Sequence, residues 1–126
     1  MKELQAEAEQ FLKEKYSMSD FNAYQRSAAR TAIYPHQHKI LYPALGLAGE
    51  AGEVAKKVKK LIRDGPDNRP DTWREDIASE IGDVLWYCAA LATDLNLTLG
   101  MIAAQNEKKL SKRKRDGTIG GSGDTR

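Results

Sequence analysis

Two pairs of carboxylates stand at helical spacing in the middle of the sequence: Glu50 with Glu53, and Glu80 with Asp83. Residues three apart are neighbours on one face of an α-helix, so each pair would present its two acids together. Carboxylate oxygens without histidine or cysteine are the donors that hard divalent cations prefer, which favours Mg²⁺, with Mn²⁺ as a possible substitute. The alternative for the first pair is a solvated helix face.

The second pair argues for a metal site more strongly. On a helical projection, Glu80 falls at the edge of the apolar arc of its segment, and Asp83 lies beside it. A carboxylate on a core-facing edge is costly unless a cation or hydrogen bonds accompany it. No lysine or arginine occurs between Arg74 and Lys108, so these acids have no cationic neighbour in sequence. We therefore expect an external cation to hold them.

Helical patterns surround these acids, and no segment has a convincing strand pattern. The predicted helices cover residues 3–14, 21–32 (capped by Ser17 or Ser19), 44–63, 72–95 (capped by Asp71 or Thr72, with Glu75 completing a capping box) and 98–116. Pro35 and Pro43 bracket a loop, and Gly65 stops the third helix. Because helices joined by a short loop pack antiparallel, the acid pairs should converge. The sequence predicts an all-α bundle of four to five helices with an antiparallel central hairpin carrying the acidic site.

The segment 44–63 has two chemically different faces. The glutamates and lysines share one side, and we expect the other side to face the core. That side is an apolar arc of Leu45, Ala48, Ala51, Ala55, Val58 and Ile62, widened by Leu47, Val54 and Leu61. Glycines flank the acids at Gly46, Gly49, Gly52 and Gly82. Since mid-helix glycine costs about 1 kcal/mol relative to alanine, their number predicts a close approach of helices. Tight packing without a ligand site is the alternative for Gly52 and Gly82.

Length and composition limit the class of protein. The chain has 126 residues, 40% of them hydrophobic and 30% charged, which predicts a single domain over residues 1–126 with a glycine-rich, flexible tail at 117–126. The net charge of +2 gives no overall field for DNA or anionic lipid. One cysteine, Cys88, excludes an intrachain disulfide, and no apolar run approaches a membrane span. We expect a cytoplasmic protein without a membrane partner.

The strings Leu45-Gly-Leu-Ala-Gly-Glu-Ala-Gly-Glu-Val-Ala and Glu80-Ile-Gly-Asp-Val-Leu-Trp-Tyr resemble the MazG-type nucleoside triphosphate pyrophosphohydrolases over about residues 20–126. Members of that family are all-α enzymes that convert (deoxy)nucleoside triphosphates to monophosphate and pyrophosphate with Mg²⁺. They assemble as dimers or tetramers. The resemblance implies that Glu50, Glu53, Glu80 and Asp83 hold the metal, and that the chain forms a homodimer or homotetramer.

Further candidate residues suit a nucleotide substrate. Asn106, Lys109 and Arg113 share one face of the last helix, where an amide suits a base or sugar and the cations suit phosphate oxygens. The family often carries such a pattern after its acidic helix; a solvated basic helix end is the alternative. Tyr87 follows Asp83 by one turn and is a candidate for the substrate pocket, although core packing is the simpler role. The lysines of the third predicted helix are candidate partners for a substrate phosphate, and Lys57 and Lys60 lie closest to its carboxylate side. The tail is a candidate cover for a triphosphate, or a disordered end.

Together these features predict a Mg²⁺-dependent pyrophosphohydrolase for house-cleaning or nucleotide-pool control, with Glu50 or Glu53 orienting the attacking water. One alternative is a non-enzymatic helical module that binds nucleic acid through residues 108–115. That stretch holds six basic residues but no aromatic residue for base stacking, which argues against it. The other alternative is a structural oligomer whose acids lie on its surface.

Overall fold

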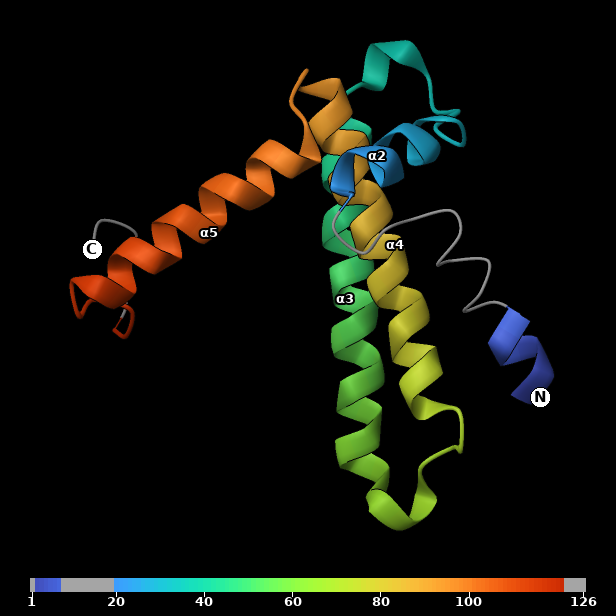
Figure 1. Ribbon diagram of the computed structural model, residues 1–126. Coiled ribbons are helices and arrows are strands. Elements are labelled where there is room, and N and C mark those ends of the chain that lie inside the picture. Colours follow the sequence, from blue (N-terminus) through green and yellow to red (C-terminus); the bar gives the residue numbers. More distant parts are fainter. Residues whose placement is uncertain (1, 8–19, 122–126) are drawn as a thin grey trace.

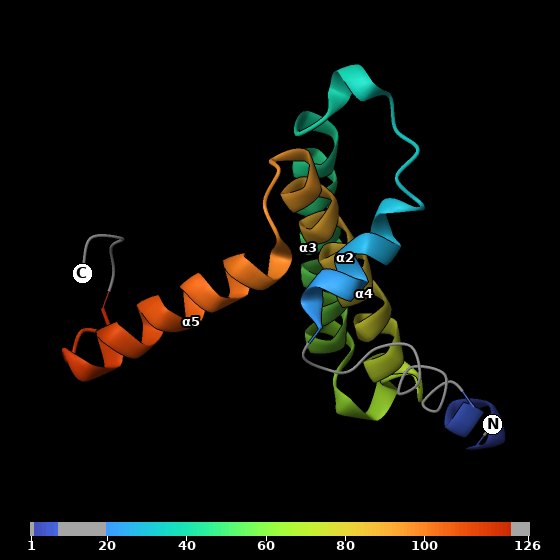
Figure 2. The same ribbon diagram turned by 45° about the horizontal axis from the view of Figure 1, so that its top comes forward.

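A computed structural model describes residues 2–7 and 20–121, and every regular element in these two ranges is helical. Residues 2–7 form a helical stretch, and the elements that follow are α2 (Phe21–Ala29), η1 (His36–His38), α3 (Leu41–Asp64), η2 (Pro66–Asn68), α4 (Trp73–Asp94) and α5 (Leu99–Arg115). The long helices α3 and α4 lie side by side, α2 packs across α4, and α5 extends away from the hairpin (Figures 1 and 2). The predicted all-α class is confirmed.

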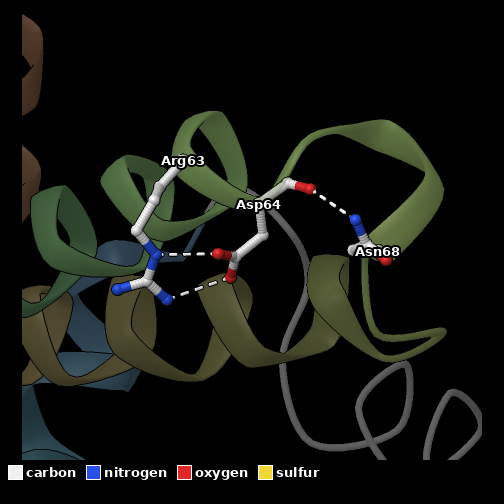
Figure 3. Close-up of polar contacts among 3 residues, drawn as sticks. All are labelled: Arg63, Asp64 and Asn68. Carbon is white, nitrogen blue, oxygen red and sulfur yellow. Dashed lines mark hydrogen bonds and ion pairs between the residues drawn. The ribbon is translucent and has the colours of Figure 1, made fainter.

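The hairpin reverses direction at a short, well-defined turn. α3 ends at Gly65, whose φ of 78° belongs to the left-handed region that favours glycine, and its N–H donates to the carbonyl of Leu61 at 3.0 Å. Figure 3 shows the polar contacts beside it, where Arg63 pairs with Asp64 and the Asn68 amide donates to the Asp64 carbonyl at 2.8 Å. The predicted stop of the third helix is therefore confirmed, and α4 runs back antiparallel along α3.

A small buried core lies where α2 crosses α4 near the start of α5. Its members are Ala28, Ala89 and Leu99, with the half-buried Tyr24, Trp86 and Cys88 packed against them. The side chain of Gln25, only 8% exposed, joins three elements at this point. Its amide nitrogen donates to Thr93 Oγ1 (3.0 Å) and the Leu97 carbonyl (2.9 Å), and its amide oxygen accepts the Leu99 N–H (2.7 Å). These bonds satisfy otherwise open groups at the end of α4 and the start of α5.

α5 leaves the hairpin at a fixed angle. It begins after the predicted cap residue Thr98, whose hydroxyl accepts the Met101 N–H at 3.2 Å, and the chain bends by 104° between α4 and α5. Asn22 of α2 accepts the Gly100 N–H at 2.9 Å, in a contact so close that a side chain on Gly100 would collide with it. Among the described residues no single helix is long and apolar enough to cross a membrane. Among these residues, only the bent pair of α4 and α5 taken together has the length and the apolar composition of a membrane-crossing segment.

Several predicted helix boundaries need correction. The second helix is capped by Asp20, which accepts the Ala23 N–H at 2.8 Å, and it ends at Ala29 rather than at Ala32. Ser17, Ser19 and the predicted helical residues 8–14 lie outside the described residues. The third helix begins at Leu41, so Pro43 belongs to its first turn and not to the loop, because proline needs no N–H partner there.

The start of α4 lacks the predicted side-chain cap. Thr72 occupies the cap position but its side chain caps no backbone N–H, and it donates instead to Asp76 Oδ2 at 3.0 Å. The capping box with Glu75 is therefore wrong, because the Thr72 hydroxyl is engaged by a different side chain. At the far end, the predicted tail begins with a turn in which the Thr118 N–H donates to the Arg113 carbonyl at 2.8 Å, and residues 122–126 lie outside the described residues.

Candidate metal and nucleotide site

Three of the predicted carboxylates meet across the hairpin. Glu50 projects from α3, and Glu80 and Asp83 project from α4, with one oxygen of each within 4.8 Å of the others. Glu50 and Glu80 are half-buried, and Asp83 is exposed. These are hard oxygen donors on two facing helices, so they fit a divalent cation such as Mg²⁺. The fourth predicted ligand, Glu53, is half-buried one turn further along α3 and is not part of this three-residue cluster.

The electrostatics of Glu50 reflect this crowding. Its pKa is raised above the ordinary value, first by desolvation and then by the charge of Asp83, hydrogen bonding with Glu80, and the charges of Glu80 and Glu53. Like charges held this close disfavour ionisation of the group between them. All three of the other predicted acids, Glu53 included, therefore act on the ionisation of Glu50. A bound cation would offset the repulsion among these acids, as expected of a metal-ligand cluster.

Lys57, which the sequence placed on the carboxylate side of its helix, contributes a positive charge to the cluster. Its Nζ lies 3.4 Å from Glu80 Oε1, and the two side chains are 35% and 18% exposed. The expectation that the acids of α4 have no cationic neighbour holds along the sequence but is wrong in space, because the antiparallel hairpin brings α3 beside them. Lys57 therefore offsets part of the negative charge of the cluster on the side of Glu80.

Aromatic side chains lie beside Glu50 and Asp83. The Tyr87 ring lies directly over Gly46, and a Cβ at position 46 would overlap it, so this glycine permits a close approach of α4 to α3. Burial, the neighbouring Tyr42 and the charges of Glu50 and Asp83 raise the pKa of Tyr87. Tyr42 stacks on Tyr34 with ring centroids 4.7 Å apart, and Trp86 meets Tyr87 edge-on at 5.0 Å. The result is an aromatic wall beside the carboxylates.

An open hollow of about 330 Å³ lies between the acids and this wall. Its lining residues are Thr31, Glu50, Asp83, Trp86 and Tyr87. The Trp86 indole N–H donates to Thr31 Oγ1 at 2.8 Å, which ties the turn after α2 to this rim. A surface that joins carboxylates to aromatic faces has the two features that a metal-bound nucleotide needs, namely oxygen ligands for the cation and a ring on which a base can stack.

The glycine pattern was only partly informative. Gly46 has the close contact that the sequence predicted, but nothing lies within 4 Å of the Cβ position at Gly49, Gly52 or Gly82. The predicted tight packing at these three positions is wrong for the single chain. Their side of the helices faces open space because α3 and α4 meet along a different line.

The remaining predicted residues lie apart from the cluster. Asn106, Lys109 and Arg113 all belong to α5, which points away from the hairpin (Figure 1). Asn106 and Lys109 are exposed, and Arg113 is half-buried with a covered Nε that has no hydrogen-bond partner in the described part of the chain. The fold of one chain thus joins Glu50, Glu80, Asp83, Lys57 and Tyr87, but it does not bring the cations of α5 to them.

Other acids of α4 have structural roles that the sequence did not reveal. Asp94 accepts both the Tyr34 O–H (2.8 Å) and the Ile40 N–H (2.9 Å), and it thereby anchors the loop before α3. Ile40 has a φ of 69°, a strained conformation for a β-branched residue, and this bond holds it in place. Burial and the hydrogen bond to Asp94 raise the pKa of Tyr34 to about 12. Gln25 and Asp94 were missed because their partners lie more than 50 positions away in the sequence, where no local pattern marks them.

The described fold defines an all-α protein in which two antiparallel helices hold a carboxylate cluster beside an aromatic wall. A family model, the MazG nucleotide pyrophosphohydrolase domain, matches residues 38–118, which include the whole hairpin and α5. The chain therefore belongs to the MazG family. It is also similar to the Gene 37 protein of Mycobacterium phage L5, with 44% identity over 109 residues, 82% of this chain and 96% of that protein. No solved structure matches the chain.

Proposed function

We propose that this protein is a Mg²⁺-dependent pyrophosphohydrolase that converts (deoxy)nucleoside triphosphates to monophosphate and pyrophosphate. The observation that carries the proposal is the meeting of Glu50, Glu80 and Asp83 oxygens within 4.8 Å on two facing helices. Membership of the MazG family supports the substrate class. A role in house-cleaning or nucleotide-pool control, in the cytoplasm, is part of the proposal.

In this mechanism the three clustered acids, with Glu53 one turn further along α3, are the ligands for Mg²⁺ or for Mn²⁺ in its place. A bound divalent cation would supply Lewis-acid polarisation of the phosphate oxygens. Glu50 or Glu53 orients the attacking water and accepts its proton. Lys57 keeps Glu80 in place through their ion pair.

The hollow beside the cluster is the proposed substrate pocket. Tyr87 presents its ring next to Glu50 and Asp83, where a base or sugar would pack while the phosphates approach the acids. Asn106, Lys109 and Arg113 are proposed to contact the substrate, the two cations holding the pyrophosphate that leaves. The active form is proposed to be a homodimer or homotetramer, since large apolar side chains such as Leu45, Ile62 and Ile81 are 65%, 79% and 53% exposed in the single chain.

The test is a panel of the canonical and modified deoxynucleoside triphosphates with Mg²⁺, analysed for monophosphate and pyrophosphate. We expect turnover of at least one nucleotide, its loss on chelation of the metal, and a loss of about 100-fold in Glu53→Gln, as is typical when a charged group of a hydrolytic site is removed. Glu75→Gln, an exposed acid on the same hairpin, is the matched control and should keep its activity.

No turnover of any nucleotide, or full turnover by Glu53→Gln, would contradict the proposal. Salt-sensitive retention of DNA by a chain that lacks the four acids would favour the nucleic-acid-binding alternative.

A further inference from the structure

A second cavity lies at the turn of the hairpin, where α3 passes through η2 into α4. It has a volume of about 210 Å³ and shares no lining residue with the hollow beside Tyr87. Its apolar part comes from both long helices, with Leu61 of α3 and with Trp73 and Ile77 of α4, all half-buried. The proposed nucleotide pocket therefore does not account for this cavity.

Three cations line this cavity, namely Lys57 and Lys60 of α3 and Arg69 of the segment before α4. Lys57 and Lys60 are three residues apart, so they are neighbours on one face of the helix. The Arg69 guanidinium lies over the Trp73 ring, 5.0 Å from its centroid, and this cation–π contact orients it. Within residues 20–121 neither Lys60 nor Arg69 forms an ion pair, so the charges of both are available to a ligand.

The two acids that line the cavity do not cancel these charges. Asp64 is already paired with Arg63, which donates to both carboxylate oxygens at 2.7 and 3.0 Å (Figure 3). The hydrogen bonds from Arg63, and then the charges of Arg63 and Lys60, lower the pKa of Asp64. Asp76 accepts the Thr72 hydroxyl at 3.0 Å and is the one lining acid without an ion pair in the described part of the chain. The cavity therefore carries an excess of positive charge.

The first turn of α4 adds to this positive charge. Trp73 and Asp76 belong to that turn, and α4 begins without a side-chain hydrogen bond from its cap residue. The amino end of a helix carries a partial positive charge, which favours an anion close to it. An anion in the cavity would thus meet the cations of α3 and Arg69 together with the positive end of α4.

Lys57 connects the cavity to the carboxylate cluster. Its Nζ lies 3.4 Å from Glu80 Oε1, and the same side chain lines the cavity. Lys60 lies about one turn closer to the hairpin turn, which is roughly 5 Å along the helix. A group bound between these two lysines would therefore lie next to the cluster and not within it.

We propose that the cavity at the hairpin turn is an anion site that binds a phosphate or pyrophosphate group through Lys57, Lys60 and Arg69. Ammonium and guanidinium groups are the donors that phosphate oxygens prefer, and the small volume suits a compact anion better than a whole nucleotide. Two sources offer this chemistry, the terminal phosphates of a bound triphosphate and the free pyrophosphate released from it. The inference rests on the proposed function for that source only, because the binding of the anion does not depend on turnover.

Titration with pyrophosphate in a chelating buffer tests the site without metal and without turnover. We expect Lys60→Gln and Arg69→Gln each to weaken pyrophosphate binding by about tenfold, because each removes charge-assisted hydrogen bonds. Lys59→Gln is the matched control, since it removes the same charge from an exposed neighbour on α3 that does not line the cavity. Equal affinities of these three variants, or no binding of pyrophosphate to the wild type, would overturn the proposal.

Asp76→Asn should have the opposite effect. It removes a negative charge from the lining and keeps an oxygen that can accept the Thr72 hydroxyl, so pyrophosphate should bind more tightly than to the wild type. Melting curves of each variant establish that it is folded.

The two tryptophans of the chain report where the anion binds. Trp73 lines the cavity and Trp86 lines the hollow beside the acids, so their indole N–H signals in a heteronuclear NMR spectrum distinguish the two places. Trp73→Phe assigns the signals. We expect pyrophosphate to shift the Trp73 signal more than the Trp86 signal. A larger shift of the Trp86 signal would place the anion at the acid cluster and overturn the proposal.

A nucleotide added to the same titration identifies the source of the anion. If a deoxynucleoside triphosphate displaces pyrophosphate from Trp73 while its monophosphate does not, the site holds the terminal phosphates of the substrate. If pyrophosphate stays bound beside the triphosphate, the site holds the released anion. Both results support an anion site and differ only in what fills it.

The titration also separates this site from the proposed function. If the wild-type chain hydrolyses no nucleotide but pyrophosphate binding is weakened in Lys60→Gln and not in Lys59→Gln, the function fails while the anion site stands. If the wild-type chain is active but these two variants bind pyrophosphate equally well, the anion site fails alone.

Discussion

The two faces of α3 show how differently one helix can use its residues. One face, with Leu47, Val54 and Leu61 beside Glu50 and Glu53, is half-buried against α4. The other, the apolar arc of Leu45, Ala48, Ala51, Ala55, Val58 and Ile62, is exposed. The sequence pattern predicted that the whole arc, including Leu47, Val54 and Leu61, faces the core, which is right for these three residues and wrong for the other six. The glutamates share the half-buried face, as the predicted convergence of the acid pairs requires. The difference shows that the carboxylates lie on the face that packs against α4, and that the exposed apolar arc is available for the homo-oligomeric contact proposed above.

The largest effect is expected on the acid face. Glu50→Gln should lower nucleotide turnover by about 100-fold, because it removes a proposed metal ligand, yet it should not destabilise the metal-free fold. It removes a carboxylate whose ionisation is disfavoured by desolvation and by its acidic neighbours, so that its pKa is raised. Turnover assays and thermal melting at neutral pH check both effects, with Glu75→Gln as the control. A large drop in melting temperature would mean that Glu50 supports the hairpin rather than a metal.

The apolar face is tested by a charge. Ile62→Asp should dissociate the assembly, because it places a carboxylate in the contact between chains, and sedimentation velocity would show the change. In a free single chain the same substitution should change the free energy of unfolding by less than about 0.5 kcal/mol, because Ile62 is 79% exposed. Ile33→Asp is the matched control, an exposed apolar residue outside the hairpin, and it should leave the assembly intact. If the sedimentation profile of Ile62→Asp were unchanged, the apolar arc of α3 would not be part of a contact between chains.

The line along which α3 meets α4 can be tested with two glycines. Gly46→Ala should destabilise the fold by about 1–3 kcal/mol, because the new methyl group would overlap the Tyr87 ring. Gly49→Ala meets nothing within 4 Å in the single chain and should stabilise the helix by about 0.5–1 kcal/mol there. Denaturant unfolding measures both. If Gly49→Ala instead weakens the assembly, the open side of α3 is occupied by a second chain.

The smallest effect concerns pH. Because the pKa of Glu50 is raised in the folded chain, the folded state binds more protons than the unfolded state just above the ordinary value of 4.5. The stability of the metal-free protein should therefore fall as the pH rises through the window between that value and the raised one. Melting curves of the wild type and Glu50→Gln, measured side by side in a chelating buffer, isolate this component. If the stability of the two proteins changed with pH in the same way, the ionisation of Glu50 would not be the cause of the pH dependence.

Much of the helical framework was predictable because its signals are local. Gly65 ends α3, Thr98 caps α5, and the carboxylate spacing at Glu50 and Glu80 places acids on helix faces, all through contacts within a few residues. Errors at the helix starts occurred where another nearby side chain made the contact that the pattern assigned to a different residue. Thr72 donates to Asp76 instead of capping its helix, and Asp20, not an earlier serine, caps α2.

The sequence by itself determined that the chain is helical, that a hairpin turns at Gly65, and that acids at a spacing of three face one way on each long helix, since backbone geometry alone sets these features. Only the tertiary structure decided which face of α3 turns inward and that Lys57 meets Glu80. It also decided that Gln25 directs α5 away from its own site. Helical periodicity defines faces but not their partners, because partners depend on packing between segments far apart in the chain.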